Sequence, residues 1–136
     1  MTMVEFTIPG PARAKGRPRL GKGGRVFTPQ KTVDYENLVK LSYRQERGEV
    51  YLEGAISAQI IVHHKIPKSM PKYKQKMAED GTLYPTKKPD LDNVAKAVLD
   101  SLNGICYDDD SQITQLFVER VYSDRPSVVV TLEELE

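Results

Sequence analysis

The stretch that decides the fold joins a patterned helix to a cluster of aspartates. From Lys87 to Ile113 the chain reads KKPDLDNVAKAVLDSLNGICYDDDSQI. Its apolar residues recur at positions 91, 94, 95, 98, 99 and 102, which is the spacing of an amphipathic helix. Asp90, directly after a proline, is a natural N-cap, and Gly104 is expected to end the helix as its C′ residue.

The polar side of this helix carries a candidate metal site. Four-residue spacing places Lys96 one turn beyond Asp92 on one face. Helix capping alone explains an aspartate at position 90, but it does not explain Asp92, Lys96 and a second cluster, Asp108 to Asp110. Converging carboxylates repel one another by about 4 kcal/mol at 4 Å and an effective dielectric near 20, and a divalent cation removes that cost. Mg²⁺ accepts a few carboxylate oxygens with water and a phosphate, so Asp90, Asp92 and one aspartate of 108–110 suit it, with Lys96 facing the scissile phosphate.

This segment resembles the RusA family of Holliday-junction resolvases, which are small homodimeric Mg²⁺-dependent endonucleases of bacteria and their prophages. The resemblance rests on Asp90-Leu91-Asp92-Asn93, on Lys96-Ala97, and on Tyr107 to Ile113. It implies four-way junction DNA as the substrate, paired nicks in DNA recombination and repair, Mn²⁺ as a substitute for Mg²⁺, and a dimer. The catalytic residues that it implies are Asp90, Asp92, Lys96 and Asp110. Asp110 is favoured by its spacing to Gln112, with Asp109 as a neighbouring metal ligand and Asp108 as an extra carboxylate.

Charge divides the chain in a way that suits a metal-dependent nuclease. Residues 1–88 carry 17 Lys and Arg against 8 Asp and Glu, whereas residues 89–136 carry 3 against 11. The first part would attract phosphates and the second would hold cations. Residues 10–28 are rich in glycine and proline and contain no acid, which predicts a mobile loop without regular structure that contacts the DNA backbone. The expected DNA-binding residues are Arg13, Lys15, Arg17, Arg19, Lys22, Arg25, Lys87 and Lys88.

The rest of the chain predicts a scaffold. Alternating patterns indicate strands at 4–8, 54–64, 112–122 and 126–133, and the inner face of the second would carry Ile56, Ala58, Ile60 and Val62. A helix is expected over 30–47, with Val33, Leu38 and Leu41 as its apolar residues. The order β-α-β-α-β-β predicts a single α+β domain over residues 1–136, a two-layer sandwich with both helices on one mixed sheet.

Several other functions are not favoured. The chain has no apolar run of membrane-spanning length, and its one cysteine, Cys106, lies in an apolar run, which fits a packing thiol in a reducing cytoplasm. His63 and His64 would point to opposite faces of a strand, so they are not expected to share a metal. Two alternatives stay open: a non-catalytic nucleic-acid-binding module with a structural ion, and a hydrolase of small nucleotides. The long basic segment argues against the second.

Overall fold

The protein is described by a computed structural model that covers residues 2–16 and 19–135. The described strands and helices, in chain order, are β1 (Met3–Pro9), β2 (Arg19–Leu20), η1 (Lys22–Gly24), β3 (Val26–Phe27), α1 (Gln30–Arg47), β4 (Ile56–Lys65), α2 (Lys72–Glu79), α3 (Leu91–Ser101), η2 (Asp110–Gln112), β5 (Ile113–Ser123) and β6 (Ser127–Glu134). The expected β-α-β-α-β-β order is present as β1, α1, β4, α3, β5 and β6. The β2–β3 pair and α2 are additions to it.

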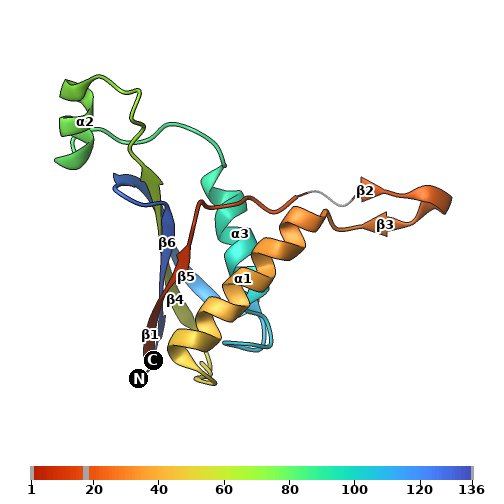
Figure 1. Ribbon diagram of the computed structural model, residues 1–136. Coiled ribbons are helices and arrows are strands. Elements are labelled where there is room, and N and C mark those ends of the chain that lie inside the picture. Colours follow the sequence, from red (N-terminus) through yellow and green to blue (C-terminus); the bar gives the residue numbers. More distant parts are fainter. Residues whose placement is uncertain (1, 17–18, 136) are drawn as a thin grey trace.

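The four long strands form one mixed sheet in the order β1-β6-β4-β5. β4 pairs with β5 in parallel, whereas β6 lies antiparallel to both β4 and β1. Helices α1 and α3 cover one face of this sheet, and the N- and C-terminal ends lie close together (Figure 1). The two-layer α+β architecture expected from the sequence is therefore confirmed.

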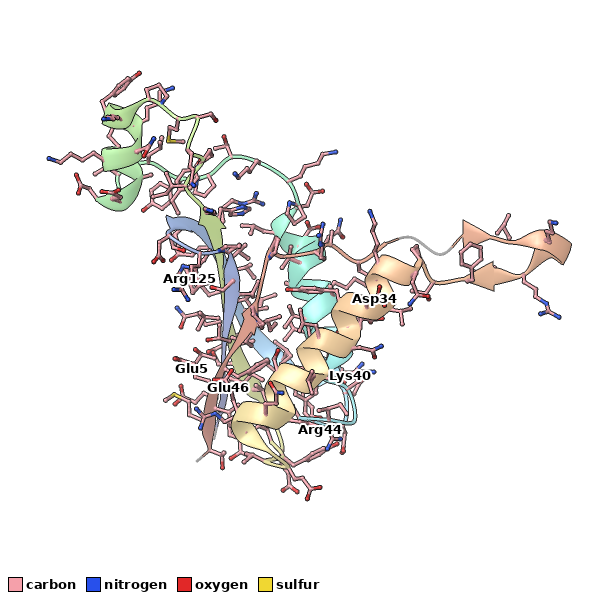
Figure 2. All side chains as sticks on the ribbon, viewed as in Figure 1. Glu5, Asp34, Lys40, Arg44, Glu46 and Arg125 are labelled. Carbon is pink, nitrogen blue, oxygen red and sulfur yellow. The ribbon has the colours of Figure 1, made fainter. Side chains whose placement is uncertain are left out.

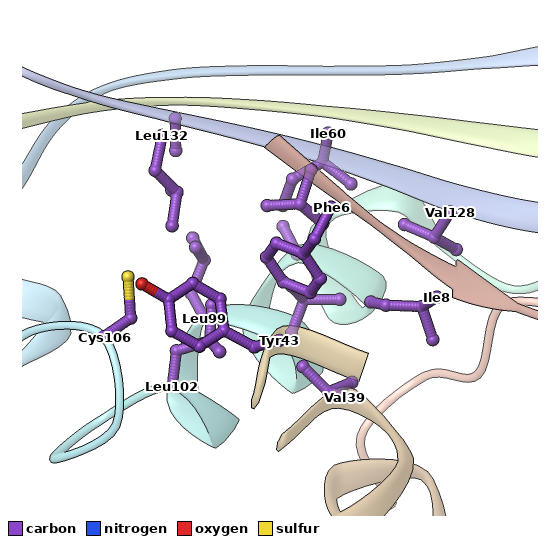
Figure 3. Packing of buried hydrophobic residues seen from close by; sticks show 14 of the residues in the cluster. Phe6, Ile8, Val39, Tyr43, Ile60, Leu99, Leu102, Cys106, Val128 and Leu132 are labelled. Atoms are coloured by element: carbon purple, nitrogen blue, oxygen red, sulfur yellow. The ribbon is translucent and has the colours of Figure 1, made fainter. Parts of the chain in front are cut away.

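The core lies between the sheet and the two helices (Figure 3). The four residues expected on the inner face of β4 are all at most 2% exposed. From the helix side, the Tyr43 ring meets Phe6 edge to face, with ring centroids 5.2 Å apart. The hydroxyl of Tyr43 donates to the Val50 carbonyl at 2.5 Å, so the polar end of this buried ring is satisfied.

The buried face of α1 differs from the expected one. Tyr35, Val39 and Tyr43 are buried, whereas Leu41 is 53% exposed. Four-residue spacing places the two tyrosines and Val39 on one stripe, and the aromatic rings bury more apolar surface than the leucines would. Leu38 packs only partly against the core.

The basic segment after β1 is only partly irregular, so the expectation that it lacks regular structure is wrong. Arg19 pairs with Phe27 and Leu20 with Val26, and the 3₁₀ turn η1 joins these two short strands. Gly23 and Gly24 adopt φ values of 77° and 75°, which glycine reaches without strain. The resulting hairpin stands away from the sheet and helices (Figures 1 and 2).

Helix α3 ends close to where the sequence predicts. Its C-cap is Leu102, so Gly104 lies one position beyond C′ and not at it. Gly104 still takes a positive φ of 75°, and its N–H donates to the Tyr107 carbonyl at 2.7 Å. This contact starts the turn that brings the aspartate cluster back beside the helix. No described helix is long and apolar enough to cross a membrane.

Candidate active site

One stripe of α3 presents charged side chains to a cavity of about 470 Å³. Asp92, Lys96 and Asp100 follow one another at four-residue intervals, so they lie on one side of the helix. Asp110 faces the same cavity from the loop after the helix. The remaining wall is apolar and consists of Ala95, Leu99, Leu116 and Val118.

The loop that carries Asp110 is held by buried contacts. The Tyr107 hydroxyl donates to the Leu99 carbonyl at 2.6 Å, and burial raises the pKa of this tyrosine, which keeps it a neutral donor. The backbone N–H of Leu52 donates to the Cys106 carbonyl at 2.7 Å. Tyr107, Leu52 and Cys106 are fully buried, so the loop is held against the core at Cys106 and at Tyr107.

Asp110 and Asp100 form a close carboxyl pair. The Asp100 carboxylate beside it, which can accept a hydrogen bond from a protonated Asp110 carboxyl, is the main cause of a raised pKa at Asp110, and partial burial adds to it. A proton shared by two carboxyl groups relieves the repulsion that both negative charges would produce. A cation bound between the two carboxylates would relieve the same repulsion, so the pair is a candidate cation site.

The other two aspartates of the cluster have structural contacts. Asp109 Oδ2 accepts from the Ser111 N–H at 3.1 Å, while Gln112 Oε1 accepts from the Asp109 N–H at 3.0 Å, which completes a capping box for η2. The bond from Ser111 lowers the pKa of Asp109. Asp108 accepts from the Tyr51 hydroxyl at 2.6 Å, and that contact raises the pKa of Tyr51 to about 12.

Lys15 reaches this site from the segment after β1. Its Nζ lies 2.7 Å from Asp100 Oδ2, and its backbone N–H donates to the Asn93 carbonyl at 3.4 Å. The hydrogen bond with Asp100 is the main cause of a raised pKa at Lys15, so the ammonium stays charged. The sequence predicts Lys15 as a DNA contact, but in the structure this ammonium is bonded to a site carboxylate.

Asp90 lies apart from the other predicted catalytic residues. It occupies the N-cap position of α3 as expected, but its exposed side chain accepts no capping hydrogen bond. It is also not among the residues that line the cavity. It precedes Asp92 by two residues, about half a turn of helix, and its N-cap backbone is extended and not helical.

The donor set fits a hard divalent cation held by few protein ligands. Within residues 2–16 and 19–135, no three His, Cys, Asp or Glu side chains converge closely enough to enclose a metal. The expected convergence of Asp90, Asp92 and Asp110 into one group is therefore not observed. Mg²⁺, however, is usually bound by one or two carboxylates, with water and phosphate as its other ligands. The Asp100–Asp110 pair, with Asp92 on the same cavity, satisfies that requirement.

The predicted DNA-binding residues separate into two groups. Arg13, Lys87 and Lys88 line a second cavity near the start of α3. Lys22 and Arg25 lie at the exposed turn of the β2–β3 hairpin. Arg17 and the side chain of Arg19 lie outside the described part of the chain.

Asp100 is the residue that the sequence interpretation missed. It continues the four-residue spacing of Asp92 and Lys96, and that spacing was the signal available to find it.

Comparison with known proteins identifies the family. A family model described as endodeoxyribonuclease RusA matches residues 9–133. The chain is also 39% identical over 140 residues, 99% of each chain, to the uncharacterized protein YqaN of Bacillus subtilis (strain 168). The chain therefore belongs to the RusA family of endodeoxyribonucleases, which are DNA-cleaving enzymes.

Proposed function

We propose that this endodeoxyribonuclease is a Mg²⁺-dependent Holliday-junction resolvase that acts as a homodimer and cuts opposing strands of a four-way junction by paired nicks. Its role would be in DNA recombination and repair, and its substrate would place it in the cytoplasm. The observation that carries the proposal is the joint lining of one cavity by Asp92, Lys96, Asp100 and Asp110. The family membership supplies the class of reaction.

The proposed cation ligands are Asp92, Asp110 and the newly found Asp100. The resemblance to the family adds Asp90, which lies outside the cavity in this structure. Bound Mg²⁺, or Mn²⁺ in its place, would polarise the scissile phosphate and activate the attacking water. Asp100 and Asp110 carry the negative charge that attracts the cation, and Lys15 neutralises that charge in its absence. The apolar residues Leu99, Leu116 and Val118 complete the lining of the cavity.

Lys96 would act on the phosphate and not on the cation. It lies one turn from both Asp92 and Asp100 and lines the cavity between them. An ammonium group placed there neutralises the charge that develops on phosphate oxygens during in-line attack. Its effect should therefore be larger on the rate than on DNA affinity.

A labelled synthetic four-way junction and a linear duplex of matched arm sequence test this proposal. We expect junction cleavage with Mg²⁺ or Mn²⁺, none with EDTA, and little cleavage of the duplex. Equal cleavage of both DNAs would exclude selectivity for junctions. Binding without cleavage in either metal would favour the non-catalytic module.

Variants then separate chemistry from binding. Asp90→Asn, Asp92→Asn and Asp110→Asn should each abolish cleavage while junction binding stays intact or tightens, because each change removes a negative charge near phosphate. Lys96→Ala should lower the single-turnover rate by about 10² with little change in affinity. Full activity of Asp92→Asn would contradict the mechanism.

A further inference from the structure

A second cavity, of about 340 Å³, lies where the end of β4 meets the segment that leads into α3. Its charged lining is basic and consists of Arg13, His63, His64, Lys65, Lys87 and Lys88. Proline and alanine side chains make up the rest, and no acidic residue is among the described residues that line it. A concave surface with this lining attracts anions.

His64 has an unsatisfied ring nitrogen at this cavity. It follows Ile60 and Val62 on the core-facing side of β4, and it is the last residue of the strand on that face. Its Nε2 atom is buried and has no hydrogen-bond partner within the described part of the chain. Buried polar atoms are normally paired, so an unpaired one in a basic cavity points to a ligand.

The groups around His64 indicate what kind of ligand this cavity would bind. Burial first, and then the positive charges of Arg120 and Lys87, lower the pKa of His64. Arg120 approaches from β5 and donates to the Pro89 carbonyl at 2.7 Å, while the Lys87 ammonium lies 5.8 Å from the centre of the Tyr122 ring. Arg13 approaches from the segment after β1, and His63, Lys65 and Lys88 complete the surroundings. An anion would offset all of these charges.

We propose that this cavity binds a backbone phosphate of the DNA strand whose scissile bond lies at the carboxylate cavity, and that His64 Nε2 donates a hydrogen bond to it. This inference rests on the proposed function for the identity of the strand. Lys87 and Lys88 support it, because they line the cavity and lead within two residues to Asp90 at the start of α3. One strand could therefore follow the basic residues into the active site.

Proton uptake follows from this arrangement. Burial and then the cationic neighbours disfavour protonation of the imidazole in the free protein, whereas a bound phosphate would favour its protonated, donating form. DNA affinity should then rise as the pH falls from 8 to 6, by up to about tenfold per pH unit, which is the limit for uptake of one proton.

The first test follows the imidazole directly by NMR in wild-type protein. The chain has two histidines, so His64→Gln and His63→Gln assign the two ring signals. We expect junction DNA, added in EDTA to prevent cleavage, to shift the His64 signal and raise its titration midpoint. Inorganic phosphate, added separately, should produce the same shift only at much higher concentration. A His64 signal that does not move at saturating DNA would overturn the proposal. A signal that moves with inorganic phosphate but not with DNA would overturn it as well, and would identify a site for free anions.

The second test measures junction affinity by fluorescence anisotropy between pH 6 and pH 8. Wild type should show the rise at low pH, and His64→Gln should lose it while remaining folded. An unchanged pH dependence in His64→Gln would overturn the proposal. Both tests measure binding, so they are independent of cleavage. If the protein cleaves junctions but His64 does not respond to DNA, the phosphate site is wrong and the proposed function stands. If His64 responds to DNA but junctions are not cleaved, only the proposed function is contradicted.

Discussion

At the scale of single residues, Asp100 links three parts of the candidate active site. It contacts Asp110 and Lys15 and faces the cavity shared with Asp92 and Lys96. The sequence interpretation assigned it no role. The structure places it at the centre of the charged cluster.

We expect Asp100→Asn to lower junction cleavage by about 10², the effect of losing a group that binds or orients metal ligands. Binding of the junction in EDTA should be retained. Asp109→Asn is the matched control, because asparagine caps a helix as well as aspartate does, and it should cleave at nearly the wild-type rate. Single-turnover rates across a Mg²⁺ titration measure both variants. Equal losses would show that Asp109 also acts on the metal, as the sequence allows.

The buried Cys106 gives a second residue-scale prediction, about pH and reactivity. Burial raises the pKa of its thiol to about 11. The thiolate fraction at pH 8 is then about 10⁻³, and the buried sulfur is inaccessible as well. Reaction with a thiol reagent should therefore be very slow in native protein and rapid in urea. Fast native labelling at pH 8 would contradict the packing of the loop that holds Asp110.

At the scale of elements, substitutions in α1 show which face of this helix stabilises the fold. Val39 is fully buried, whereas Leu41, two residues later, is 53% exposed. Val39→Ala should lower the free energy of unfolding by about 2 kcal/mol, because it removes buried apolar surface and leaves a cavity behind. Leu41→Ala should change it by less than about 0.5 kcal/mol. Urea denaturation measures both free energies of unfolding. A larger loss of stability for Leu41→Ala than for Val39→Ala would support the buried face expected from the sequence.

At the same scale, substitutions in the β2–β3 hairpin test whether its basic residues bind DNA. Replacing Lys22 and Arg25 by alanine should weaken binding to all DNAs and reduce the log–log salt slope, by up to about 0.9 for each DNA phosphate that the variant no longer neutralises. The matched control is a double alanine variant of Lys40 and Arg44, which lie farther along α1 (Figure 2). If both double variants change the slope equally, the hairpin has no special part in binding DNA.

At the scale of the whole molecule, paired cuts in one junction require two active sites related by symmetry. A 136-residue chain obtains them most simply as an isologous dimer. Strand β5 lies at an edge of the sheet, and its Leu116 and Phe117 are 51% and 52% exposed. An edge strand with exposed apolar side chains is a surface on which protein chains associate.

The protein should sediment as a dimer of about twice its chain mass of 15.4 kDa. On a supercoiled plasmid with a cruciform, wild type should release linear DNA by coupled nicking. Dimers mixed from wild-type and Asp92→Asn chains should leave nicked circles instead. A stable monomer that makes paired cuts in one binding event would contradict the symmetric mechanism while leaving the metal site intact.

The sequence by itself determined the local elements and the class of chemistry. Apolar spacing placed α3 and the inner face of β4 correctly, because burial on one face imposes a period that can be read residue by residue. The Asp-Leu-Asp-Asn element and the aspartate cluster pointed to the family for the same reason: each is a short pattern within one segment.

Only the tertiary structure decided which side chains meet. The pairing of Lys15 with Asp100 joins residues 85 positions apart, and the end of β4 approaches the start of α3 through a basic cavity. It also decided that Asp109 caps a turn while Asp110 faces Asp100. Spacing to Gln112 favours Asp110 in the sequence, but spacing cannot show what each carboxylate contacts. That is set by the loop, which Tyr107 and Leu52 hold against the core.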